Sequence, residues 1–233
     1  LRRQHVFFLH GFNPAEPHTD IFSMLLVNDA LKLASVGSIT LVLPYLPYLR
    51  QDRKDRPRVP ISARTLADLI QCNRLVTHII TVDMHTDQAQ GFFSIPVDNL
   101  TARPLFVAHF QKMFGEVMED VVVVAPDFGD AKRARSFAKK LGVPVTIFEK
   151  DRPGANQSTV LSVMGAPVNG KRVIMYDDMI DTGGTMRGVM RSLKEMGATE
   201  VHVCTTHGIF SADAESAFTE LGFPVGSTNT LPR

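Results

Sequence analysis

Residues 172–186 read Arg-Val-Ile-Met-Tyr-Asp-Asp-Met-Ile-Asp-Thr-Gly-Gly-Thr-Met, and this stretch decides the fold class. After Arg172 come four apolar residues, partly β-branched and too few for a helix, so residues 172–176 predict a short buried strand. A turn that contains glycine follows, and a helical pattern begins at Met186. Such a strand–turn–helix is typical of a phosphate site, because glycine lets the backbone approach an anion and the amides at the helix start point at it.

Three carboxylates, Asp177, Asp178 and Asp181, follow the predicted strand. Acids repel phosphate, whereas the vicinal hydroxyls of a sugar suit them, because carboxylate oxygens accept hydrogen bonds. An ordinary capped helix start explains the glycine and threonine of the turn, but not three crowded like charges. We infer a sugar phosphate as the ligand and expect the turn's threonines to cap the helix and donate hydroxyls. The turn residues are Thr182, Gly183, Gly184 and Thr185.

Composition excludes several classes of protein. The chain has 233 residues, with 25 basic and 24 acidic side chains, so nothing global indicates a nucleic acid or an anionic membrane as partner. No apolar run reaches the length of a membrane span and no signal peptide pattern is present. Cys72 and Cys204 give neither a disulfide framework nor metal-ligand spacing. We expect a cytoplasmic protein.

Apolar runs alternate with amphipathic patterns along the chain, which predicts an α/β fold with parallel sheets covered on both faces. Ligands of such sheets bind at the carboxyl ends of the strands. Strands are predicted near His5–Gly11, Ile39–Tyr45, His78–Asp83, Val121–Pro126, Val145–Glu149, Arg172–Tyr176 and Val201–Thr205. Helices are predicted near Asp20–Ala34, Ser62–Gln71, Pro104–Phe114, Ala131–Leu141, Met186–Met196 and Ala212–Leu221.

A basic segment, residues 50–58, follows the second predicted strand. Five basic residues and two acids give it a net charge of +3, and Pro57 and Pro60 argue against a helix. A solvated loop is the plain interpretation. The segment is expected at the same end of the sheets as the sugar-phosphate site. A loop that binds polyphosphate is therefore the better interpretation, because guanidinium groups match phosphate oxygens.

Two further predicted strands end in groups that suit a divalent cation. His85 lies between Asp83 and Asp87, and Asp127 and Asp130 follow another strand. A lone histidine is more often structural than a metal ligand. Histidine with carboxylates holds divalent ions, although Mg²⁺ prefers oxygen and keeps several waters.

Residues 149–153, Glu-Lys-Asp-Arg-Pro, follow the strand near Val145–Glu149 and precede residues typical of a mobile loop. The plain interpretation is a charged surface hairpin. The functional one is a lid that brings Lys150 and Arg152 to a transferring phosphoryl group, where positioning and positive charge do most of the work.

The turn motif at 177–185 resembles the signature that binds phosphoribosyl diphosphate (PRPP) in the type I phosphoribosyltransferase fold, which also includes PRPP synthetases. Residues 44–62, the segments Asp83-Met-His85, Gln90-Gly-Phe-Phe93 and Ile95–Leu100, and residues 149–153 together resemble ribose-phosphate pyrophosphokinase, over essentially the whole chain. The combination of Arg-Gln-Asp-Arg-Lys with Gln-Gly-Phe-Phe is far more specific than the PRPP motif.

The resemblance implies two phosphoribosyltransferase type I-like domains, residues 1–99 and 100–233, each a mostly parallel sheet flanked by helices. It implies an enzyme that transfers the β,γ-diphosphoryl group of MgATP to the C1 hydroxyl of ribose 5-phosphate. By the same resemblance, the residues have the following roles. Arg50, Gln51 and Arg53 bind ATP; His85 and Asp127 bind magnesium; Lys150 and Arg152 are catalytic; Arg152, Asp177, Asp178, Asp181, Thr182, Gly183, Gly184 and Thr185 bind ribose 5-phosphate.

Two alternatives remain open: a phosphoribosyltransferase that consumes PRPP, and a regulatory subunit that assembles with active synthetases. The chain departs from the family pattern by lacking an N-terminal adenine-binding loop and a C-terminal helix, so we expect a fragment, a trimmed chain or a short form. Asp130 stands where the family has glycine, and it either repels the diphosphate or helps to bind an ion.

Assembly is implied mainly by the resemblance, since the family forms hexamers built from dimers. A homo-oligomer is therefore expected. The segment Ile21–Leu33 is apolar on more than one face, which suits either a core or a subunit interface.

Overall fold

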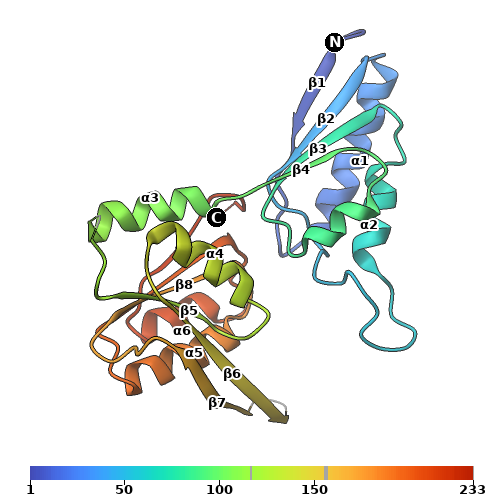
Figure 1. The fold of residues 1–233 in the computed structure, drawn as a ribbon. Helices are drawn as coiled ribbons and strands as arrows, with labels where there is room; N and C mark the ends of the chain where they lie inside the picture. Colours follow the sequence, from blue (N-terminus) through green and yellow to red (C-terminus); the bar gives the residue numbers. More distant parts are fainter. Residues whose placement is uncertain (116, 155–156, 233) are drawn as a thin grey trace. The chain divides into compact units, whose positions relative to one another are not determined.

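The computed structural model describes residues 1–115, 117–154 and 157–232, with the side chains of 150–162 outside that description. The chain forms two compact units. The first comprises Leu1–Thr101 with the last residues from Asn229, and the second comprises Ala102–Thr228 (Figure 1). The α/β fold class that the sequence predicts is confirmed. Within the described residues no helix is long and apolar enough to cross a membrane.

The first unit is a four-stranded, wholly parallel sheet in the order β1-β2-β3-β4. Its elements, in chain order, are β1 His5–Leu9, α1 Pro17–Leu33, β2 Ser38–Leu43, α2 Ser62–Ile70, β3 Val76–Val82, the 3₁₀ helix η1 Asp87–Phe92 and β4 Val97–Leu100. The strand β4 was not predicted, because four residues with alternating exposure carry little pattern.

Burial in this unit is one-sided. On one face of β2, Ile39 and Leu41 are fully buried. On the opposite face, Phe7, Leu9 and Leu100 are 68%, 67% and 53% exposed. The expectation that both faces of every sheet are covered is therefore wrong for this unit. The helix α1 is likewise only partly buried, with Ile21 and Met24 inside and Phe22, Leu26 and Leu33 exposed.

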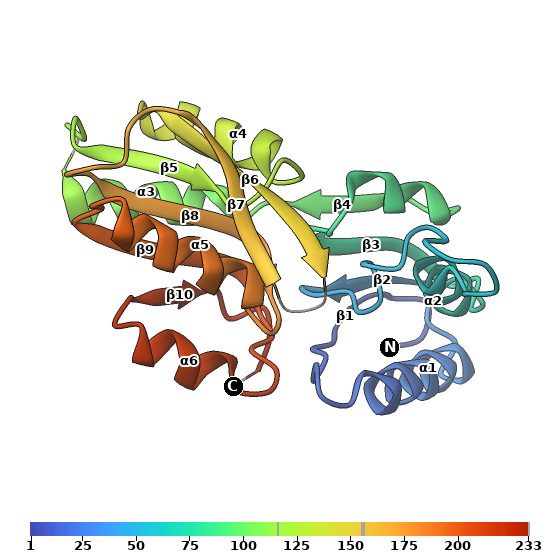
Figure 2. The same cartoon turned by 90° about the horizontal axis from the view of Figure 1, so that it is seen from below.

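The second unit is a six-stranded sheet in the order β10-β9-β8-β5-β6-β7, parallel except for the β6–β7 pair. Helices cover both faces of this sheet (Figure 2). Its elements are α3 Arg103–Phe114, β5 Val121–Ala125, α4 Ala131–Leu141, β6 Val145–Gly154, β7 Gln157–Gly165, β8 Arg172–Ile180, α5 Gly184–Glu195, β9 Glu200–Gly208, α6 Ala214–Glu220 and β10 Val225–Ser227.

Side-chain alternation along the central strands builds two cores. Val122 and Val124 belong to the cluster that contains Met190 of α5. On the other face, the ring of Tyr176 lies 4.9 Å from that of Phe137 on α4. The strand β5 is buried at all five residues, as expected for a central parallel strand.

Two strands are longer than predicted, and both corrections concern functional residues. The strand β8 runs to Ile180 rather than Tyr176, because β9 continues beside it and pairs Met179 with His207. The strand β6 runs to Gly154 rather than Glu149, because it pairs with β7. The strands β7 and β10 were not predicted.

Candidate functional site

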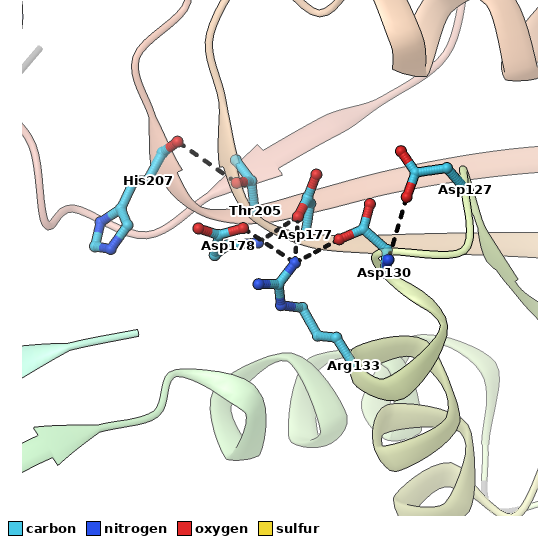
Figure 3. Close-up of polar contacts among 7 residues, drawn as sticks. All are labelled: Asp127, Asp130, Arg133, Asp177, Asp178, Thr205 and His207. Carbon is cyan, nitrogen blue, oxygen red and sulfur yellow. Dashed lines mark hydrogen bonds and ion pairs between the residues drawn. The ribbon is translucent and has the colours of Figure 1, made fainter. Parts of the chain in front are cut away.

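An ion-pair cluster lies in the second unit, where residues of β8 meet the start of α4 (Figure 3). The Nη1 atom of Arg133 lies 2.7 Å from Oδ1 of Asp130, 2.6 Å from Oδ1 of Asp177 and 3.0 Å from Oδ1 of Asp178. Asp178 is 3% exposed. We call these four residues the carboxylate cluster.

Topology explains why these residues meet. The strands β5 and β8 are parallel neighbours, and α4 begins just after β5, so its first turn faces the end of β8. Consecutive residues of a strand normally point to opposite faces. Here the carboxylate of Asp177 folds back and accepts the amide N–H of Asp178 at 2.8 Å, so both carboxylates reach Arg133.

The cluster contains one cation and three carboxylates. This excess of negative charge shifts the pKa values of Asp177 and Arg133. Burial raises the pKa of Asp177 well above its usual range, the negative charges of Asp130 and Asp178 raise it further, and Arg133 opposes the change. Burial alone would lower the pKa of Arg133, but the three carboxylates together raise it. Arg133 therefore keeps its charge, and Asp177 retains its proton to a higher pH than an ordinary aspartate.

The turn that follows β8 is built around Gly183, the N-cap residue of α5. Its φ of 68° is left-handed, and a Cβ atom there would lie 2.6 Å from the ring of Phe218. No side chain of the described residues caps α5, so the expectation that threonine caps this helix is wrong. Asp181 accepts the hydroxyl hydrogen of Ser211, which ties the turn to the loop after β9.

Asp127 and Asp130 follow β5, and both groups of Asp130 have partners in the structure. Its carboxylate pairs with Arg133, while its amide donates to Oδ1 of Asp127 at 3.2 Å. Among the side chains that the structure describes, no three of the His, Cys, Asp or Glu type converge as a metal site.

In the first unit the basic segment forms a loop between β2 and α2. Its five basic side chains are exposed, as is Gln51. The hydroxyl of Ser62 donates to Oε1 of Gln51 at 2.5 Å, and the amide of Ala63 donates to the carbonyl of Gln51 at 3.2 Å. The segment is therefore anchored at Gln51 to the start of α2.

His85 is half-buried in the loop between β3 and η1. The loop begins at Asp83, whose φ of 40° is uncommon outside glycine. The amide of Met84 donates to Oδ1 of Asn99 at 3.0 Å, which fixes this loop against β4. His85 belongs to the first unit and Asp127 to the second.

Lys150 and Arg152 were predicted to be catalytic. Their backbone belongs to β6, in which Lys150 pairs with Val160 of β7, while their side chains lie outside the described residues.

The sequence-based reasoning missed Arg133. One signal for it was available: Arg133 follows Asp130 by three residues at the start of a helix, on a flank of the face that buries Ala134 and Phe137. A cation at that place, opposite a strand that ends in two acids, is a candidate for pairing with them.

The comparisons with known proteins agree with the fold of the two units. Residues 1–73 match the model of the N-terminal domain of ribose phosphate pyrophosphokinase, and residues 96–218 match that of the phosphoribosyl transferase domain. The chain is 42% identical to ribose-phosphate pyrophosphokinase 1 of Lactococcus lactis, over 95% of this chain and 69% of that protein. It is 42% identical to ribose-phosphate pyrophosphokinase of Aquifex aeolicus, over 100% of this chain and 73% of that protein.

A solved structure is also similar. The phosphoribosylpyrophosphate synthetase of Mycobacterium smegmatis superimposes with a TM-score of 0.85 and is 41% identical, with 98% of this chain and 72% of that one covered.

Proposed function

The chain belongs to the ribose-phosphate pyrophosphokinase family, and from that premise we propose that it makes PRPP from ATP and ribose 5-phosphate. The C1 hydroxyl oxygen forms a bond to the β-phosphorus, and the bond from that phosphorus to the α,β-bridging oxygen breaks. AMP leaves with the bridging oxygen, and the hydroxyl proton is released. In such a transfer, catalysis is mostly positioning and electrostatic stabilisation.

The observation that carries the proposal is the carboxylate cluster beside the Gly183 turn. We propose that the amides at the start of α5 bind the 5-phosphate. Asp177 and Asp178, with Asp181 beside them, accept hydrogen bonds from the sugar hydroxyls, because one carboxylate accepts several. Thr182, Gly184 and Thr185 complete the proposed site. Since Arg133 fixes the carboxylates beforehand, little ordering is left to be done on binding.

The basic segment is proposed as the ATP site. Arg50 and Arg53 are exposed cations, and Gln51 is held by Ser62. Guanidinium groups bind phosphate oxygens with charge-assisted hydrogen bonds. Lys150 and Arg152 are proposed to stabilise the charge of the transferring group, with Arg152 also contacting ribose 5-phosphate.

The donor set fits magnesium bound mainly through substrate. Mg²⁺ is usually held by one or two protein groups together with phosphates and waters, so a converging cluster of protein ligands is not required. We propose that Asp127 of the second unit supplies a carboxylate, and His85 of the first unit an imidazole, to magnesium sites of this kind. When bound, Mg²⁺ would neutralise charge on the phosphate oxygens.

A cytoplasmic location and a homo-oligomer, by family resemblance a hexamer built from dimers, are part of the proposal. The balanced charge supports the first. Exposed apolar side chains on β1 and α1, among them Phe7, Leu9 and Phe22, support the second.

The experiment is to incubate the chain with ATP, ribose 5-phosphate and Mg²⁺ and to measure AMP and PRPP. AMP that appears in step with PRPP supports the proposal. A phosphoribosyltransferase would instead consume added PRPP without ATP, and a regulatory subunit would release AMP only with an active partner present.

A further inference from the structure

One contact joins the basic segment to the loop that carries His85. The hydroxyl of Thr86 donates to Oδ2 of Asp52 at 3.1 Å, across 34 residues of sequence. Both side chains are half-buried and both belong to the first unit. The contact therefore links the proposed ATP loop to the proposed metal loop within one compact unit.

Thr86 is the N-cap residue of η1, with φ −133° and ψ 134°. A threonine in that position ordinarily uses its side-chain oxygen to cap the helix. Among the described residues no side chain caps η1. The Thr86 hydroxyl is directed to Asp52 instead, which favours a role outside the local turn.

Both neighbours of His85 are fixed by side-chain hydrogen bonds. On one side the amide of Met84 donates to Asn99, and on the other Thr86 donates to Asp52. Asn99 also donates to Oδ1 of Asp87 at 3.3 Å. His85 therefore lies in a loop held by β4 at one end and by the ATP loop at the other.

Asp52 lies between Gln51, which is anchored to α2, and the exposed Arg53. Its acidic charge among cations has no direct use in binding a polyphosphate, because a carboxylate repels phosphate. Its contact with Thr86 gives it a use in fixing the position of the loop.

We propose that Asp52 and Thr86 are positioning residues, which hold Arg50, Gln51 and Arg53 in register with His85 so that one nucleotide meets both loops. This inference rests on the proposed function and deepens it. Loss of either partner lets the loops move independently, so magnesium–nucleotide binding weakens while the fold persists.

The test measures binding of α,β-methylene-ATP with Mg²⁺ by calorimetry, since that analogue cannot transfer its diphosphoryl group. For Thr86→Ala and Asp52→Ala we expect Kd to rise about tenfold, the scale of one hydrogen bond to a charged group. The double variant should also lose about tenfold rather than a hundredfold, because the two changes remove one shared interaction.

Two controls separate positioning from general damage. Thr86→Ser keeps the hydroxyl and should bind within about twofold of the original chain. Thr65→Ala removes an exposed threonine of α2 whose hydroxyl donates to the carbonyl of Ile61, and it should leave binding unchanged. Thermal melting should stay the same for all variants.

Absence of binding by the unaltered chain overturns the proposed function and this inference with it. Binding that Thr86→Ala leaves unchanged, or losses that multiply in the double variant, overturn this inference alone. Failure of Thr86→Ser to restore affinity would do the same.

Discussion

Each unit has one polar edge at its candidate site: the basic segment in the first unit and the carboxylate cluster in the second. The two edges are opposite in charge and in burial. The first unit presents exposed cations on residues 50–58, where Arg56 and Asp55 form a loose, exposed pair at 3.5 Å. The second unit holds acids within β8, one of them 3% exposed, around a single arginine. Exposed cations cost the fold little, whereas buried acids must be compensated. Stability should therefore depend on the second edge and nucleotide affinity on the first.

The largest effect should follow from removing Arg133. Arg133→Met leaves three carboxylates without their cation, and breaking a buried pair from one side costs about 3–5 kcal/mol. Chemical denaturation should show that loss. Arg135→Met, on the exposed side of the same helix, is the matched control and should change stability by less than about 0.5 kcal/mol. Equal losses of unfolding free energy for the two variants would contradict the claim that stability depends on the carboxylate cluster.

The next effect concerns the turn before α5. Gly183→Ala requires a left-handed alanine and moves a methyl group against Phe218, so we expect a loss of about 2 kcal/mol together with weaker ribose 5-phosphate binding. Gly184→Ala is the paired control, since a Cβ there meets nothing within 4 Å. Denaturation curves that coincide for the two variants would contradict the role given to Gly183.

At the other edge, Arg53→Ala should act on affinity alone. We expect the KM for ATP to rise about tenfold, because a charge-assisted hydrogen bond to phosphate is lost. Stability should stay within about 0.5 kcal/mol, since the side chain is exposed. Steady-state kinetics and melting on one preparation check both. A large fall in melting temperature would show that the first edge is also structural.

The smallest effect is on the pH dependence of stability. A carboxyl group whose pKa is raised by folding stabilises the fold below its unfolded value, and that contribution is lost as pH rises through the folded value. Asp177 should therefore make the free energy of unfolding fall as pH rises from about 4. Asp177→Asn should flatten this part of the profile. An identical profile for the variant would exclude Asp177 as its source.

The sequence predicts the regular elements well where patterns are long. The six predicted helices all occur among the described residues, because each is an amphipathic or apolar run of at least seven residues. The strand β4 has four residues and β10 has three, which is too few for a period to show. Their strand structure depends on pairing with β3 and β9, which lie far away in sequence.

The candidate site was predictable in its parts but not in its assembly. The turn at Gly183 was predictable from local sequence. Glycine and threonine directly after an apolar strand indicate a turn, whatever the rest of the chain contains. The position of Asp177 inside β8 depends on its pairing with Thr205, and its partner Arg133 lies 44 residues away. Asp130 differs from Asp177, because it lies only three residues before Arg133 at the start of α4 and their pairing is local.

The most direct test of the whole interpretation follows the phosphorus atoms of ATP by ³¹P NMR with ribose 5-phosphate and Mg²⁺ present. We expect the β- and γ-phosphorus signals of ATP to be replaced together by the signals of a diphosphate on C1 of the sugar. AMP should appear in equal amount. Release of inorganic phosphate alone, or no change in a preparation that melts cooperatively, would contradict diphosphoryl transfer.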